Sequence, residues 1–121
     1  MTQEQKDLLL KDLCARLKYD VKISVNDKIE TLQGINVLDN VVEYDLFLSC
    51  SIEEVKHYLF PLSSMTEEQK EEQKDLLENQ YHFDANGYVF TLQDFYCKYH
   101  FDYRGLIPMG LAIDCTKLNI Y

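Results

Sequence analysis

The pattern of hydrophobic positions in the first 17 residues predicts an amphipathic helix. Thr2 and Gln5 have the spacing of a capping box, in which each side chain accepts a hydrogen bond from the other residue's backbone N–H. Apolar residues then recur at the i, i+3, i+4, i+7 spacing of one helical face, at Leu10, Leu13, Cys14 and Leu17. We therefore expect a helix from about residue 3 to 17, with Cys14 as a small core residue rather than a nucleophile.

From Asp20 onward the hydrophobic period changes to two, which is typical of strands. The first expected strand carries alternating apolar residues, Val21, Ile23 and Val25, and ends at the turn formed by Asn26 and Asp27. A second strand is expected over residues 28–38, with Gly34 at a bulge or bend. After a tight turn at residues 39–40, a third strand carries Val42, Tyr44, Leu46 and Leu48. The pattern therefore predicts a three-stranded antiparallel meander after the N-terminal helix.

The second half of the chain has helical signals. Capping patterns begin at Ser51, Thr66 and Thr91, and each predicts the start of a helix. The first helix is short, over residues 52–58, and the second begins at Thr66. The third is expected to be buried through an aromatic stripe, formed by Leu92, Phe95, Tyr96 and Tyr99. Residues 66–75 contain no apolar side chain, so the second of these helices should face solvent or a polar surface. Residues 111–113 and 118–120 are expected to form short edge strands. The predicted fold class is α+β, in a single domain over residues 1–121.

Composition and charge limit the classes of function. A chain of 121 residues with 46% hydrophobic residues is long enough for one core. It has no apolar run of roughly 18 residues, and its first residues are polar and acidic, so we expect a cytoplasmic protein with no membrane partner. A net charge of −9 disfavours direct binding of nucleic acid. The four scattered cysteines form no Cys-x-x-Cys pair, so we expect free thiols, no metal and no cofactor.

An internal echo is the most unusual motif. Residues 81–87 and 99–105 share the pattern Tyr-His-Phe-Asp-x-x-Gly, 18 residues apart. The simplest interpretation is a repeated helix exit, in which the aromatic side chain packs on the core, Asp accepts a backbone hydrogen bond and Gly adopts a left-handed conformation. The alternative is a small hydrolase in which the echoed side chains converge, with each His as proton acceptor and each Asp as its orienting partner: His82, Asp84, His100 and Asp102. Cys97 and His100 also have a spacing that would place a thiol and an imidazole on one helical face.

Arg104 is the best candidate for contact with a ligand. It is one of only two arginines and lies among aromatic residues, and a guanidinium beside an aromatic wall suits a phosphate or a nucleobase. The alternative roles of Arg104 are to bridge an acidic surface residue or to stack on a tyrosine. Arg16 is interpreted as a plain charge at a helix C-terminus. The candidate ligand-binding set is Arg104, Tyr103, His100, Tyr99, Asp102 and His82, and no catalytic residue is assigned.

Three blocks carry a family resemblance: Asp12-Leu-Cys-Ala-Arg-Leu17, the block from Val55 to Glu68, and His100-Phe-Asp-Tyr-Arg-Gly-Leu-Ile-Pro-Met-Gly-Leu-Ala112. Together they resemble an uncharacterised small-protein family encoded by phages, prophages and mobile elements of gut anaerobic bacteria. The chain departs from that family at residues 17–20 and at residues 95–97. The resemblance implies a setting, the cytoplasm of a bacterial host, and no particular reaction.

The sequence as a whole favours a non-enzymatic phage or mobile-element accessory protein that acts by binding. The purpose we expect is counter-defence, by sequestering a small anionic, nucleotide-type signalling molecule. The second hypothesis is a protein-interaction module that docks on a host protein through the acidic helix or an aromatic patch. Nine tyrosines and six phenylalanines are many for so small a core, so we also expect a homodimer or a higher homo-oligomer.

Overall fold

The N-terminal helix, α1 (Gln3–Arg16), begins where the capping pattern predicts, in a computed structural model that describes residues 1–45, 48–83 and 85–121. The Gln5 backbone N–H donates to Thr2 Oγ1 at 3.1 Å, and the Thr2 N–H donates to Gln5 Oε1 at 3.0 Å. The helix continues as a 3₁₀ turn, η1 (Leu17–Tyr19), and ends at Asp20, whose φ of 54° is left-handed.

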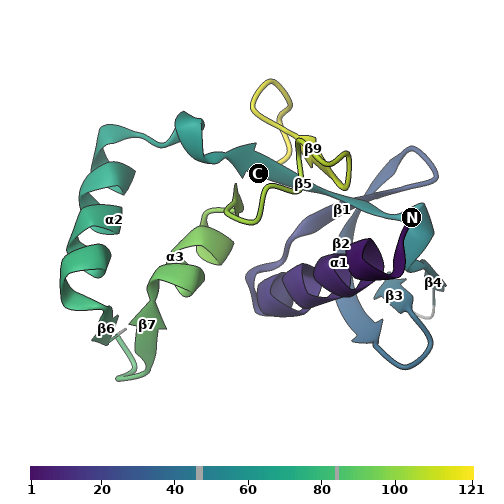
Figure 1. Ribbon diagram of the computed structural model, residues 1–121, viewed down its shortest axis with the longest axis horizontal. Coiled ribbons are helices and arrows are strands. Elements are labelled where there is room, and N and C mark those ends of the chain that lie inside the picture. The colour runs from purple at the N-terminus through teal and green to yellow at the C-terminus, as the bar shows by residue number, and fades with distance from the viewer. Residues whose placement is uncertain (46–47, 84) are drawn as a thin grey trace.

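The described part of the chain contains one seven-stranded sheet, in the order β4-β3-β2-β1-β5-β8, with β9 also paired to β5 (Figure 1). The first four strands form an antiparallel meander, one strand more than predicted: β1 (Lys22–Val25), β2 (Lys28–Asn36), β3 (Val41–Tyr44) and β4 (Leu48–Ser51). Strand β5 (Lys56–Pro61) lies antiparallel to β1. Two short strands, β8 (Phe101–Asp102) and β9 (Ala112–Asp114), lie parallel to β5.

The predicted helix over residues 52–58 is wrong beyond residue 54. Ser51 Oγ accepts a hydrogen bond from the Glu53 N–H, but this cap starts only a single 3₁₀ turn, η2 (Ile52–Glu54). The chain then enters β5, which takes a central place in the sheet and has a buried run at residues 57–59. Pairing on both sides of a buried strand outweighs the local helix signal.

Two further sequence expectations have a mixed outcome. At the C-terminal end, residues 112–114 form β9, whereas residues 118–120 form no strand. In the predicted third strand, Leu46 lies outside the described residues, and residues 41–44 and 48–51 form separate, paired strands.

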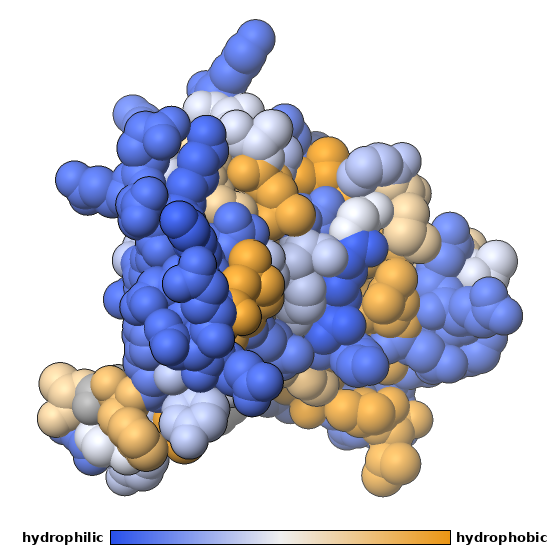
Figure 2. Space-filling model, turned by 60° about the vertical axis from the view of Figure 1, so that its left-hand side comes forward, coloured by the Kyte–Doolittle hydropathy of each residue, from blue (hydrophilic) through white to orange (hydrophobic). Residues whose placement is uncertain are grey.

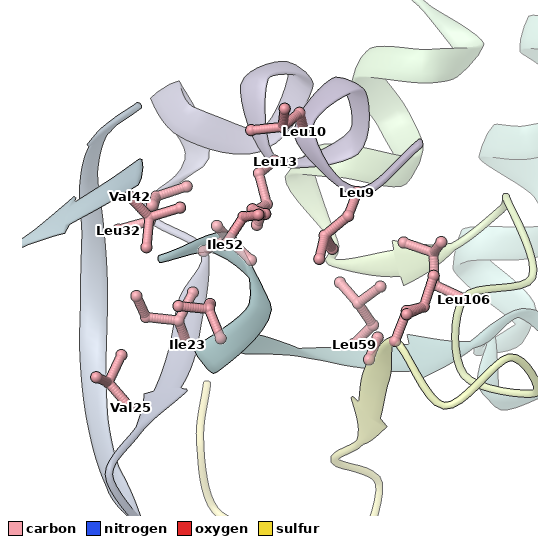
Figure 3. Packing of buried hydrophobic residues seen from close by; sticks show 14 of the residues in the cluster. Leu9, Leu10, Leu13, Ile23, Val25, Leu32, Val42, Ile52, Leu59 and Leu106 are labelled. Atoms are coloured by element: carbon pink, nitrogen blue, oxygen red, sulfur yellow. The ribbon is translucent and has the colours of Figure 1, made fainter. Parts of the chain in front are cut away.

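The main core lies between α1 and the sheet (Figure 3). Leu9, Leu10 and Leu13 of α1 are buried against apolar side chains of the sheet and of the turn after β4, which include Ile23, Val25, Leu32, Val42, Ile52 and Leu59. Cys14 is exposed, so its predicted place in the core is wrong. The buried face of α1 is instead completed by Asp12 and Arg16.

A second, aromatic core lies under the remaining helices. It is surrounded by a 3₁₀ turn, two helices and a hairpin: η3 (Leu62–Ser64), α2 (Glu67–Asn79), β6 (Tyr81–Phe83), β7 (Val89–Thr91) and α3 (Leu92–Lys98). Its buried members are Met65, Leu76, Phe95 and Phe101, with Phe60, Phe90, Leu92, Tyr96 and Tyr99 packed around them. The predicted aromatic stripe on α3 is therefore confirmed. No helix in the described ranges is long and apolar enough to cross a membrane.

The anchoring of α2 gives a direct test of this second core. Leu76 is the buried residue of α2, with 1% of its surface exposed, whereas the neighbouring Leu77 is 61% exposed. We expect Leu76→Ala to lower the free energy of unfolding by about 2–5 kcal/mol, because the substitution removes buried apolar atoms and leaves a cavity between α2 and the aromatic core. Chemical denaturation measures this change, and hydrogen exchange over residues 67–79 should quicken more than exchange over α1.

The matched control is Leu77→Ala, which we expect to change the free energy of unfolding by less than about 0.5 kcal/mol. Equal effects of the two substitutions would contradict the anchoring role of Leu76.

Candidate functional site

A network of charged groups around Asp12 occupies the interior beside the main core. Asp12 Oδ2 accepts hydrogen bonds from Arg16 Nε at 2.7 Å and lies 2.7 Å from His57 Nε2, while Asp12 Oδ1 accepts from Arg104 Nε at 2.9 Å. Asp12, Arg16 and His57 are fully buried. A buried charge is tolerated when its partners satisfy it, and here one carboxylate has three.

The network joins segments that are distant in the sequence. Asp12 and Arg16 lie four residues apart on the same face of α1, His57 comes from β5, and Arg104 follows β8. Arg16 Nη2 also donates to the Phe101 carbonyl oxygen at 2.6 Å. The interpretation of Arg16 as a plain helix C-terminal charge is therefore wrong, because this side chain links α1 to the aromatic core.

The electrostatics of the network leave the carboxylate ionised and the imidazole neutral. Burial alone would raise the pKa of Asp12, but the His57 hydrogen bond and the Arg16 charge outweigh it and lower that pKa to about 2. Burial also lowers the pKa of His57, and the Asp12 hydrogen bond opposes this shift without cancelling it. His57 Nε2 therefore donates its proton to Asp12. Among the described residues, His57 Nδ1 and Arg16 Nη1 have no hydrogen-bond partner.

Asp12 and His57 form a carboxylate–imidazole pair, a combination that also occurs in catalytic dyads, but this pair is not accessible to a substrate. A general base must come within hydrogen-bond reach of a substrate proton. Asp12 and His57 are completely enclosed, so no substrate can reach them. The network is a structural element.

Arg104 and Tyr103 are held by internal contacts. Beyond its bond to Asp12, Arg104 donates from Nη2 to the Tyr103 hydroxyl at 2.9 Å, and its guanidinium carbon lies 4.8 Å from the Tyr103 ring centroid. Only 15% of the Arg104 side chain is exposed. These contacts match the alternative roles named for Arg104, with a buried carboxylate in place of a surface one. Burial raises the pKa of Tyr103 to about 12.

The two echoed segments serve different purposes. Asp102 accepts hydrogen bonds from the backbone N–H groups of Leu106 and Ile107, both at 2.9 Å, and Gly105 has a φ of 76°. The predicted turn is thus confirmed for the second copy. In the first copy Gly87 is also left-handed, with a φ of 81°, but Asp84 lies outside the described residues.

The two echoed histidines have separate surroundings. His82 Nε2 lies 2.8 Å from Asp75 Oδ2. His100 stacks on Tyr121, with ring centroids 3.6 Å apart and planes 10° from parallel. Burial, aided by the Arg16 charge, lowers the pKa of His100 to about 4, so this imidazole is neutral at pH 7.

The thiol of Cys97 is not activated. Helix α3 ends at Lys98, and His100 adopts a φ of 61°, so Cys97 and His100 do not share a helical face. Burial raises the pKa of Cys97, which keeps the thiol protonated at neutral pH. In the portions of the chain that the structure describes, no group of three His, Cys, Asp or Glu side chains could hold a metal ion.

A first pocket, which we call the hairpin pocket, lies among η1, α2, the β6–β7 hairpin and α3. It has a volume of about 550 Å³ and is lined by Lys18, Tyr19, Glu72, His82, Phe83, Ala85, Phe90 and Lys98. Each of its two ammonium groups lies near an aromatic ring of the same pocket. Lys18 Nζ is 5.0 Å from the Tyr19 ring centroid, and Lys98 Nζ is 5.7 Å from that of Phe90.

A second pocket, the His100 pocket, lies at the other side of Lys98. It has a volume of about 440 Å³ and is lined by Phe60, Ser64, Thr66, Gln69, Lys98, Tyr99, His100, Phe101, Thr116 and Tyr121. The candidate ligand-binding residues are thus divided: His82 lines the hairpin pocket, Tyr99 and His100 line the His100 pocket, and Tyr103, Arg104 and Asp102 bond internally.

Sequence reasoning missed Lys18 and Lys98. The two lysines are far apart in the chain and belong to no cluster of basic residues. A signal was present, however, because a Lys-Tyr pair ends the 3₁₀ turn that follows α1, and another stands at the C-terminal end of α3. An aromatic residue beside a lysine at a helix end offers a ring and a charge together.

The Asp12 network makes stability depend on pH. We expect Asp12→Asn to lower the free energy of unfolding at pH 7 by about 3–5 kcal/mol, because it leaves Arg16 buried without its counter-charge. The folded-state pKa of Asp12 is depressed from 3.8 to about 2. Its ionisation therefore contributes about 2 kcal/mol of stability above pH 4, which is lost as the pH falls from 4 toward 2.

Urea unfolding at a series of pH values measures the difference in the free energy of unfolding between wild type and Asp12→Asn. We expect this difference to narrow as the pH falls from 4 toward 2. Asp7→Asn, on the exposed side of α1, is the control and should leave both stability and its pH profile unchanged. A difference in the free energy of unfolding that stays constant from pH 7 to pH 2 would contradict an ionised Asp12 held by the network.

The two pockets, unlike the enclosed network, are open to a ligand. The hairpin pocket supplies cations and rings, and the His100 pocket supplies rings, hydroxyl groups and an amide. No protein-family model, curated protein or solved structure matches the chain.

Proposed function

We propose that this chain is a non-enzymatic binding protein whose hairpin pocket holds a small anionic ligand with an aromatic ring, of nucleotide size. The observation that carries the proposal is the placement of two ammonium groups, each beside an aromatic ring, within one pocket. A volume of about 550 Å³ suits such a ligand, since ligand pockets span roughly 300–1,000 Å³.

Each part of the ligand has a matching group in the pocket. A phosphate would lie between Lys18 and Lys98, because an ammonium binds phosphate as a point charge. A nucleobase would stack on Phe90 or Phe83, a contact worth about 1–3 kcal/mol. The Glu72 carboxylate lines the same pocket and would accept a hydrogen bond from a ribose hydroxyl or an amino group.

The charge distribution supports an anionic ligand at this place in particular. The chain as a whole carries a net charge of −9, which repels long polyanions. Two lysines and the carboxylate of Glu72 line the pocket, and Lys18 Nζ also lies 3.7 Å from Asp94 Oδ1 outside the lining. In the phage setting that the resemblance implies, such a protein would counter host defence by sequestering a nucleotide signal.

Isothermal titration with adenosine and guanosine monophosphates tests the proposal. We expect Lys18→Ala and Lys98→Ala each to weaken binding about 10- to 100-fold, because each removes a charge-assisted contact worth about 1.5–3 kcal/mol. Lys11→Ala and Lys74→Ala remove the same charge from exposed positions outside the pocket and should bind as wild type does. Equal affinity in all four variants, or no binding by the wild type, would refute the proposal.

A second candidate function is docking on a host protein through the exposed apolar side chains of the β6–β7 hairpin. Apolar side chains are exposed there and on the adjoining end of α2, with Phe83 66%, Leu77 61% and Val89 55% exposed. Figure 2 shows this hydrophobic group below the strongly hydrophilic surface of α2. An apolar patch beside an acidic helix fits a basic amphipathic segment of a partner.

Fluorescence anisotropy with a labelled amphipathic Lys/Leu helical peptide tests this candidate. Reversing Glu67, Glu68 and Glu71 to Lys should weaken binding at least about tenfold, since it turns attraction into repulsion. Leu77→Ser should also weaken binding, whereas Leu118→Ser, at an exposed leucine outside the hairpin and α2, is its control. Binding that survives both the charge reversal and Leu77→Ser would eliminate this surface.

A further inference from the structure

The wall between the two pockets is made by a lysine that belongs to both. Lys98 lines the hairpin pocket and the His100 pocket alike. Its Nζ lies 5.7 Å from the ring centroid of Phe90, which lines the hairpin pocket, and 5.1 Å from that of Tyr99, which lines the His100 pocket. One ammonium group is thus placed between two aromatic-lined spaces.

Helix α2 supplies the other side of this wall. Gln69 lines the His100 pocket, and Glu72, one turn later on the same face of α2, lines the hairpin pocket. The Tyr99 hydroxyl donates to Glu72 Oε2 at 3.0 Å, so this hydrogen bond joins a residue of one pocket to a residue of the other. The pockets are therefore neighbours along the seam between α2 and α3, and they share the side chain of Lys98.

The His100 pocket has the chemistry of a site for an uncharged aromatic group. His100 and Tyr121 form a flat stacked pair, and Phe60 and Tyr99 add further rings. Thr116 and Gln69 are among the polar residues that line it. Thr116 Oγ1 donates to Asp114 Oδ1 and Gln69 Oε1 accepts from the Thr66 N–H, which leaves the Thr116 oxygen as an acceptor and the Gln69 amide N–H groups as donors for the edge of a base. Among the side chains that line it, Lys98 is the one that carries a charge at neutral pH, since His100 is neutral there.

We propose that the two pockets together bind a dinucleotide, with one base in each pocket and the linking phosphate at Lys98. This inference rests on the proposed function of the hairpin pocket and extends it to a second, base-binding pocket. The linkage is a phosphodiester or a pyrophosphate, because either places an anion between two bases. A second stacked base adds about 10- to 100-fold in affinity.

Isothermal titration of the full chain compares three kinds of probe, each in adenine and guanine forms. The probes are the mononucleotide, the dinucleotide joined by one phosphodiester and the dinucleotide joined by a pyrophosphate. We expect at least one dinucleotide to bind about 10- to 100-fold more tightly than its mononucleotide. The relative affinities of the two dinucleotides identify the linkage.

The positions of the two bases are tested by two substitutions, each of which fills one pocket. Thr116 and Ala85 are exposed residues at the rims of the His100 pocket and the hairpin pocket, so a tryptophan at either position fills space without entering a core. Thr116→Trp should abolish the advantage of the dinucleotide and leave mononucleotide affinity unchanged. Ala85→Trp should weaken both kinds of probe. Thermal unfolding of each variant checks that it is folded.

The outcomes separate the two proposals. If mononucleotides bind in a Lys18-dependent manner and no dinucleotide binds more tightly, the dinucleotide inference is overturned while the proposed function stands. If no probe binds the wild type, both fail. A dinucleotide advantage that persists in folded Thr116→Trp would show that the second base lies elsewhere, and would also overturn the inference.

Discussion

A single buried carboxylate constrains how the parts of this protein fit together. Asp12 is enclosed beside the main core, and an enclosed anion is stable only if donors surround it. Its donors come from α1 itself, from β5 and from the segment after β8. The position of α1 relative to two other segments is therefore specified by charge as well as by apolar packing, which is less directional.

The same constraint decides which cationic side chains line the pockets. Arg104 lies in the part of the sequence richest in aromatic residues, yet the buried Asp12 engages its guanidinium. Arg16, the only other arginine, is enclosed completely. Lysines at helix ends take their place at the surface, and Lys18 and Lys98 line a pocket because α1 and α3 end beside it.

The aromatic core supplies the rings of both pockets. Phe90 and Tyr99 pack on the buried Phe95 and Phe101 and also face the two pockets. Rings held in this way are pre-ordered, so a ligand that stacks on them orders few side chains on binding. The core and the walls of the two pockets are thus parts of one aromatic cluster, and the Lys98 ammonium lies 5.7 Å from the Phe90 ring centroid and 5.1 Å from that of Tyr99.

The sequence by itself determined the local structure of this protein. The capping threonines start α1, α2 and α3 at the predicted positions, because a cap needs only residues three apart. The alternation of apolar residues placed β1, β2 and β3 but did not separate β4 from β3, and the polar composition of residues 66–75 placed most of α2 at the surface. Gly105 and Asp102 formed the predicted turn for the same reason, since their partners are neighbours in the chain.

Only the tertiary structure decided the features that depend on distant partners. Residues 56–58 carry a helical signal but become a central strand, because β1 and β9 pair with them. Asp12 is 45 residues from His57 and 92 from Arg104, and no pattern along the chain relates such positions. The echo of Tyr-His-Phe-Asp-x-x-Gly left a convergent site open as the alternative to a repeated helix exit, and folding placed His82 and His100 in different pockets. Hydrogen bonds within a turn are encoded by spacing, but burial and long-range ion pairs arise only when the whole chain has packed.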